Sequence, residues 1–159
     1  MNEVLTDKGI AKLVAEPKLL QKDYQSRIQL KPKRGHKERE LDLKGNEGSD
    51  FRLIFRQSDF NALDFSVILA FLPPSSNQLI RLRRYSGKSH MHTNKLENQT
   101  FYDYHIHITT ERYQSLSLEM IDAYAEPTDR YSDFHGAVKC MLADCSFDIP
   151  QEPQQSKGF

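Results

Sequence analysis

The sequence has only two cysteines, no long apolar run and no net charge, and each of these absences narrows the class of protein. The longest apolar stretch, residues 65–72, is far shorter than the roughly 20 residues that cross a bilayer, which argues against a transmembrane helix. Cys140 and Cys145 are five positions apart on different faces of a helix and its exit, so we expect reduced thiols. The N-terminus lacks the features of a secretory signal, which predicts a cytoplasmic protein without membrane contact.

Acidic and basic side chains balance at 22 each, but they are distributed unevenly along the chain. Residues 17–40 carry eight basic and three acidic side chains, a net charge of +5. Residues 111–159 carry four basic and nine acidic side chains, a net charge of −5. A basic segment of this kind attracts phosphate, although charge runs most often only keep a protein in solution. The zero total argues against a protein that coats DNA non-specifically, because such proteins need an excess of cations.

The spacing of apolar residues predicts one α+β domain over residues 1–147. Helical spacing indicates an N-terminal helix over 5–16, a C-terminal helix over 132–143 and a further short helix over 116–123. Apolar and polar residues alternate between the first helix and residue 110, which predicts strands over 27–31, 38–43, 51–56, 64–71, 78–85 and 101–109. Short connections favour antiparallel neighbours, so we expect a five- to six-stranded meander sheet with the helices packed on it. Residues 148–159 have little to bury and are predicted to be a disordered tail.

Four of the six histidines form two pairs with one residue between the partners: His90 with His92, and His105 with His107. If each pair lies on a strand, its two side chains point to the same face. A hairpin with a two-residue turn at residues 98–99 would set His92 opposite His105 and His90 opposite His107, with Asp103 on the same face. Imidazoles brought together in this way can hold zinc, iron, manganese or copper.

Other arrangements of this segment stay open. A slip of one residue would place the two pairs on opposite faces, and Asn98-Gln99 lacks the glycine that most two-residue hairpin turns use. His90 and His92 could instead lie in a long loop after residue 85, and loops of this length are often functional. All four histidines could also be ordinary residues of the surface and of a half-exposed strand.

Nucleic-acid chemistry is a further interpretation of the same segment. Histidines beside Arg84 and Lys88 could cleave RNA without a metal, because imidazoles serve as acid and base while a cation stabilises the phosphorane. Aromatic and basic residues also interleave here as in proteins that bind RNA or other single-stranded nucleic acids; the residues are Tyr85, Phe101, Tyr102, Tyr104, Arg81, Arg83, Arg84 and Lys88. Both residue types are nevertheless common in antiparallel strands.

Three segments carry a resemblance to a known group of proteins. Residues 84–94 read RYSGKSHMHTN, residues 101–107 read FYDYHIH and residues 125–131 read AEPTDRY. The chain resembles, over about residues 25–147, a family of small uncharacterised prokaryotic proteins that share such segments. The resemblance implies a bacterial or phage origin and a context of mobile elements, toxins or defence systems, without an assigned activity.

The function expected from the sequence is therefore that of a small cytoplasmic phosphodiester hydrolase, a nuclease with or without a divalent metal ion. The candidate catalytic residues are His90, His92, His105, His107, Lys88 and Arg84, and the candidate metal ligands are the same four histidines with Asp103. RNA or another single-stranded nucleic acid is the expected partner. The alternative is a non-catalytic binding protein, such as an inhibitor or a member of a toxin-antitoxin or defence system, whose partner is another protein.

Overall fold

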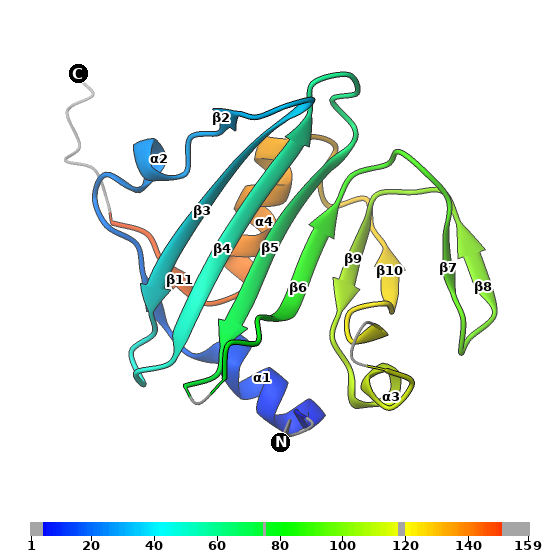
Figure 1. Cartoon of the computed structure of the whole chain (residues 1–159), viewed down its shortest axis with the longest axis horizontal. Helices are drawn as coiled ribbons and strands as arrows, with labels where there is room; N and C mark the ends of the chain where they lie inside the picture. The colour runs from blue at the N-terminus through cyan, green and yellow to red at the C-terminus, as the bar shows by residue number, and fades with distance from the viewer. Residues whose placement is uncertain (1–4, 75, 118–119, 151–159) are drawn as a thin grey trace.

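A seven-stranded antiparallel sheet forms the centre of the protein, whose computed structural model describes residues 5–74, 76–117 and 120–150. The strands follow the order β10-β9-β6-β5-β4-β3-β2. Their bounds are β2 (Lys31–Pro32), β3 (His36–Lys44), β4 (Asp50–Ser58), β5 (Phe65–Leu72), β6 (Ile80–Ser86), β9 (His105–Ile108) and β10 (Ala125–Pro127). Strands β2 to β6 are consecutive neighbours, which confirms the predicted meander (Figure 1). The sheet has more strands than the predicted five to six because it includes the short edge strands β2 and β10. Strands of two or three residues are too short to show an alternation pattern in the sequence.

Helices cover one face of this sheet. The longest, α4 (Phe134–Asp144), lies against β5 and β6, and α1 (Asp7–Ala15) lies near one end of the sheet (Figure 1). Alternation along β4 turns Phe51, Leu53 and Phe55 into the core beneath α4. We call the opposite face, which carries Ile54 and Arg56, the open face. The predicted α+β class is confirmed. Within the described ranges, no helix is long and apolar enough to cross a membrane.

Two predicted elements differ in the structure. Residues 27–31 are not a single strand, because the short helix α2 (Tyr24–Arg27) precedes β2. An ion pair between Arg27 and Asp23, four residues apart at 2.8 Å, supports this helical turn. The sequence predicts a helix over 116–123, but residues 116 and 117 lie in no helix, and the short helix α3 (Glu111–Gln114) ends before them. Helix α3 begins where the Thr110 side chain accepts a hydrogen bond from the Tyr113 amide. Residues 118–119 of the predicted helix lie outside the described residues.

Two small sheets complete the fold. Strands β7 (His92–Asn94) and β8 (Gln99–Phe101) pair only with each other, beyond the edge of the main sheet formed by β9 and β10 (Figure 1). Strands β1 (Lys18–Leu19) and β11 (Phe147–Asp148) form a parallel pair. Asp148, the first residue of the predicted tail, therefore belongs to a strand, and residues 151–159 of that tail lie outside the described residues.

A phenylalanine in the core provides a test of the fold. Phe55 is completely buried, whereas Phe60 is 87 % exposed. We expect Phe55→Ala to lower the free energy of unfolding by about 3–5 kcal/mol, because the change removes the ring and leaves a cavity. Phe60→Ala deletes the same atoms from the surface and should change stability by less than about 0.5 kcal/mol. Urea denaturation of both variants measures the difference; equal losses would contradict the burial of Phe55.

Candidate metal centre

Strand β9 presents two histidines to the open face. His105 and His107 are separated by Ile106, which points into the core, because side chains alternate along a strand. Only 2 % of His105 and 4 % of His107 is exposed. Their ring centroids lie 4.9 Å apart. The predicted placement of this pair on one face of a strand is confirmed.

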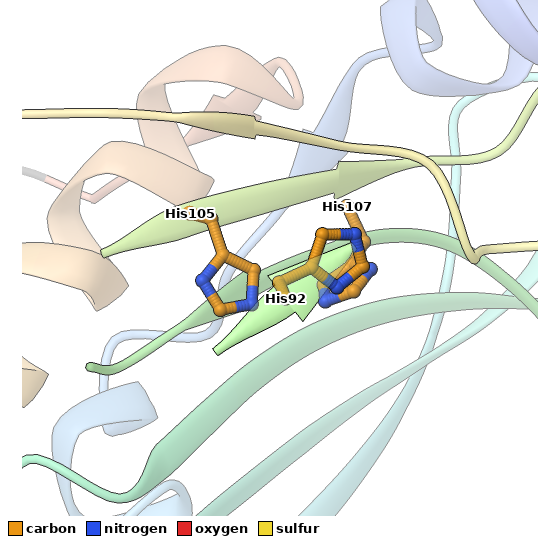
Figure 2. Close-up of side chains that lie close together, drawn as sticks. All are labelled: His92, His105 and His107. Atoms are coloured by element: carbon orange, nitrogen blue, oxygen red, sulfur yellow. The ribbon is translucent and has the colours of Figure 1, made fainter. Parts of the chain in front are cut away.

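A third histidine reaches this pair from the separate sheet formed by β7 and β8. The ring centroid of His92 lies 5.2 Å from that of His105 and 5.0 Å from that of His107. Figure 2 shows the three rings pointing toward one another, two from β9 and one from β7. One nitrogen from each ring lies within 4.8 Å of the others. We call these three residues the histidine triad.

The triad does not arise from the hairpin register predicted from the sequence. His92 pairs with Phe101, and Asn94 pairs with Gln99, so His92 is not the strand partner of His105. The turn comprises residues 95–98 instead of 98–99, and Asn98 adopts a left-handed conformation with φ of 53°. A four-residue connection does not need the glycine that a two-residue turn favours. The sheet of β7 and β8 then packs against the edge of the main sheet, and this tertiary contact brings His92 to β9.

The corrected register separates the fourth histidine from the triad. His90 precedes β7, is exposed and has its Nδ1 atom 3.1 Å from the Ser89 hydroxyl. The hairpin predicted from the sequence would place Met91 on the buried face opposite the histidines, but its side chain is 63 % exposed. Asp103 is exposed and contributes its backbone carbonyl instead of its carboxylate to the site. The structure therefore groups three imidazoles instead of four imidazoles and a carboxylate.

Hydrogen bonds that the two β9 histidines donate to backbone carbonyls define their tautomers. His105 Nδ1 lies 2.8 Å from the carbonyl oxygen of Asp103, and His107 Nδ1 lies 2.8 Å from that of Asp122. A carbonyl oxygen can only accept, so each Nδ1 carries the proton. The lone pair of each ring is therefore on Nε2. Such outer hydrogen bonds accompany metal-binding histidines in general, since they fix both the ring orientation and the ligating nitrogen.

Asn94 fixes the tautomer of His92. The buried amide of Asn94 accepts a hydrogen bond from the Ala125 amide through Oδ1 (2.9 Å) and donates one to the Ala125 carbonyl through Nδ2 (2.7 Å). These two bonds determine which end of the amide is the oxygen. His92 Nε2 lies 2.8 Å from that oxygen and must donate to it. The lone pair of His92 is therefore on Nδ1, and each triad ring has one nitrogen that is free to ligate.

Burial keeps the two β9 imidazoles neutral. Desolvation lowers the pKa of His105 from 6.5 to about 4, and the charge of nearby Arg84 acts in the same direction. Desolvation lowers the pKa of His107 to about 2, again with a contribution from Arg84. A metal ligand must be deprotonated, so both rings are in the ligating form at neutral pH.

The triad lies in a cleft of about 510 Å³ on the open face. Arg81 and Arg84 line this cleft, and both pair with the buried carboxylate of Asp122, with Nε–Oδ2 distances of 2.9 and 3.2 Å. Two guanidinium groups against one carboxylate leave an excess positive charge beside the triad. Of the residues proposed from the sequence, Arg84 and His90 line the cleft with the triad. Lys88 is not among the residues that line the cleft; its Nζ atom lies 5.7 Å from the centre of the Tyr102 ring.

Sequence reasoning missed Asn94 as an orienting residue and Asp122 as the residue that pairs with both arginines. Neither residue belongs to a local sequence motif, since their partners lie 31 and 41 residues away in the chain.

Comparisons with models of protein families, with curated proteins and with solved structures find no match to this chain. The resemblance to the uncharacterised prokaryotic family stays a prediction.

The lowered pKa values predict a loss of stability in mild acid. In the unfolded chain both imidazoles recover a pKa near 6.5, so below that pH the unfolded state binds more protons than the folded state. In the presence of chelator, we expect the free energy of unfolding to fall by about 2–4 kcal/mol between pH 7 and pH 5. His107→Gln should lose roughly half of this dependence. Urea denaturation at both pH values measures it, and an unchanged stability would contradict the burial of the two rings.

Proposed function

We propose that the protein is a metal-dependent phosphodiester hydrolase, a nuclease whose divalent transition metal is held by His92, His105 and His107. The observation that carries this proposal is the convergence of three imidazoles, each with one nitrogen hydrogen-bonded to an oxygen and the other without a partner among the described residues. Imidazole ligands suit zinc, iron, nickel and copper. Three protein ligands leave a coordination position open, as catalytic zinc sites do.

The metal-dependent version is favoured over direct acid-base catalysis. A general acid has to be protonated at the working pH, and a useful one has a pKa near that pH. The pKa values of His105 and His107, about 4 and about 2, leave almost no protonated imidazole at neutral pH. A metal ion in this position would supply the missing chemistry, because it lowers the pKa of a bound water to about 7.

Arg84 is proposed to bind the phosphate that is cleaved. It lies directly beside His107 in the sheet, because Arg84 of β6 pairs with His107 of β9. Its buried Nε atom makes no hydrogen bond within the described part of the chain, although it lies 3.2 Å from an oxygen of Asp122. The guanidinium is thus held next to the triad by Asp122, and its two terminal nitrogens are the donors proposed to bind the phosphate. A preorganised cation in this position stabilises the negative charge that develops during cleavage.

Metal analysis combined with a cleavage assay tests the proposal. Full-length protein without a histidine tag is expected to contain about one transition-metal ion per chain and to cleave RNA or single-stranded DNA. Chelation should abolish cleavage, and one transition metal should restore it where Mg²⁺ does not, since Mg²⁺ prefers oxygen ligands. Protein that contains metal but cleaves neither polymer would contradict the hydrolase. Stoichiometric co-purification with another protein would then favour the non-catalytic alternative.

A further inference from the structure

Two rows of side chains cross the open face and end at the triad. Strand pairing aligns the first row directly across four strands, β4 to β9, as Arg56, Ser66, Ser86 and His105. The second row, two residues further along each strand, consists of Ile54, Ile68, Arg84 and His107. All eight side chains line the same cleft. Neighbouring strands lie about 4.8 Å apart, so Arg56 is three spacings, about 14 Å, from His105.

Arg56 is the cation at the far end of the first row. It differs in its ion pairs from Arg52, the other arginine on the same face of β4. Arg56 is exposed and forms no ion pair among the described residues. Arg52 of the same strand is bound to Asp42 (2.7 Å) and lies 3.9 Å from Glu40. Glu38, the strand partner of Arg56, is hydrogen-bonded to His36, so the Arg56 guanidinium is less neutralised than that of Arg52 and more available to an anion.

The surface that favours an anion ends at the next strand, β3. The residues of β3 that face these rows are Glu38 beside Arg56, Glu40 beside Ile54 and Asp42 beside Arg52. Glu38 is held by His36, whose Nε2 lies 2.7 Å from the carboxylate, and this hydrogen bond lowers the pKa of Glu38. Strand β3, which lies between β4 and the edge strand β2, thus carries three carboxylates beyond the two rows, and this part of the open face is less favourable for phosphate. Asp64 also lines the cleft, and Asp122 is covered by its two arginines.

We propose that the two rows form a track for a short segment of single-stranded nucleic acid, with a flanking phosphate bound by Arg56 while the scissile phosphate lies at the triad. This inference rests on the proposed function for its ligand, a phosphodiester chain. Arg56 and Ser66 supply a cation and a hydroxyl to the backbone, and the largely buried Ser86 continues the row to the triad. Ile54 and Ile68 supply an apolar surface to the bases. The track spans about 14 Å from His105 to Arg56 and ends before the carboxylates of β3, a length that accommodates about two to three nucleotides.

Two of the four aromatic residues predicted from the sequence to stack on bases, Tyr85 and Tyr104, do not contribute to this track, whereas Phe101 packs against His92. Tyr85 is completely buried on the core face and donates a hydrogen bond to Asp144. The Tyr104 hydroxyl donates to the Ser132 carbonyl, on the side of the molecule where Tyr104 packs against Tyr131. Binding through arginine, serine and isoleucine predicts modest affinity and little preference for base sequence, because these contacts do not read base edges.

The length dependence of binding tests the track independently of cleavage. Labelled RNA and single-stranded DNA oligonucleotides of one, two, three, four and eight residues are titrated with the full chain in chelator, so that no hydrolysis occurs. Affinity should rise up to about three residues and change less than twofold beyond four. Arg56→Gln should weaken trinucleotide binding about tenfold and reduce the salt dependence by about 0.7 in the logarithmic slope, while leaving mononucleotide binding unchanged. Glu40→Lys should move the plateau to longer oligonucleotides.

Arg52→Gln is the matched control, because it removes the same side chain from the same strand and face at a position already neutralised. Binding by this variant should stay within twofold of the unaltered protein. Equal losses for Arg56→Gln and Arg52→Gln, affinity that keeps rising to eight residues, or no binding at all would overturn the track. Cleavage that does not respond to Arg56→Gln would leave the nuclease standing without the track. Binding with the expected length dependence but without cleavage would leave the track standing without the nuclease.

Discussion

Replacing His107 with alanine is expected to remove the metal and reduce phosphodiester cleavage by roughly 10²–10⁴-fold. His107 supplies one of the three imidazoles of the triad, and no fourth histidine, cysteine or carboxylate of the described residues belongs to this group. Loss of an outer hydrogen-bond partner alone commonly weakens metal binding 10–100-fold, so loss of a ligand should cost at least as much. Metal content after gel filtration and initial rates of cleavage are the measurements.

A second variant and a control separate this effect from damage to the fold. His107 is almost completely buried, so its removal could also destabilise the sheet. His92 is half-exposed on the small sheet of β7 and β8, and His92→Ala should cause a similar loss of metal and activity with little change in stability. His135→Ala removes an exposed histidine from α4 and should change neither property. Full metal occupancy in both triad variants would contradict the proposed centre.

The half of the site that lies on one strand could be predicted from the sequence. Alternation in residues 105–108 is a local property, and it places His105 and His107 on one face whatever the neighbouring strands are. The same alternation over residues 51–56 and 64–71 places Phe55, Val67 and Leu69 on one face of β4 and β5, and all three are fully buried. Phe71, near the end of β5, is only half-buried.

The other half of the site depends on tertiary contacts that no local pattern encodes. The turn at residues 95–98 shifts the pairing of β7 with β8 relative to the predicted hairpin, and Asn98 accepts the left-handed conformation that this turn needs. Packing of β7 and β8 against β10 then depends on hydrogen bonds between Asn94 and Ala125, 31 residues away. The sequence thus predicted that the histidines converge, but through direct strand pairing of His92 with His105, which the structure does not adopt.

Lys18 illustrates a structural role that its sequence context conceals. It belongs to the basic segment 17–40, whose charges were interpreted as solvated or as attracting phosphate, yet its side chain is completely buried. Its ammonium group donates to the carbonyl oxygens of Leu13, Val14, Glu16 and Cys145 at 2.8–3.0 Å. These carbonyls lie at the C-terminal ends of α1 and α4, where backbone acceptors lack partners within the helix. Desolvation lowers the pKa of Lys18 from 10.5 to about 8, so the group is still mainly protonated at neutral pH.

Lys18→Met is therefore expected to lower the free energy of unfolding by about 3–5 kcal/mol, the second large effect after loss of the triad. Methionine keeps the length and the apolar contacts of the side chain, but it leaves carbonyl groups from two helix ends buried without a donor. Lys12→Met is the matched control, since Lys12 is exposed on α1 and the same substitution there should cost less than about 0.5 kcal/mol. Urea denaturation at pH 7 compares the two variants. If both lysines tolerate methionine equally, the ammonium of Lys18 does not hold the ends of α1 and α4 together.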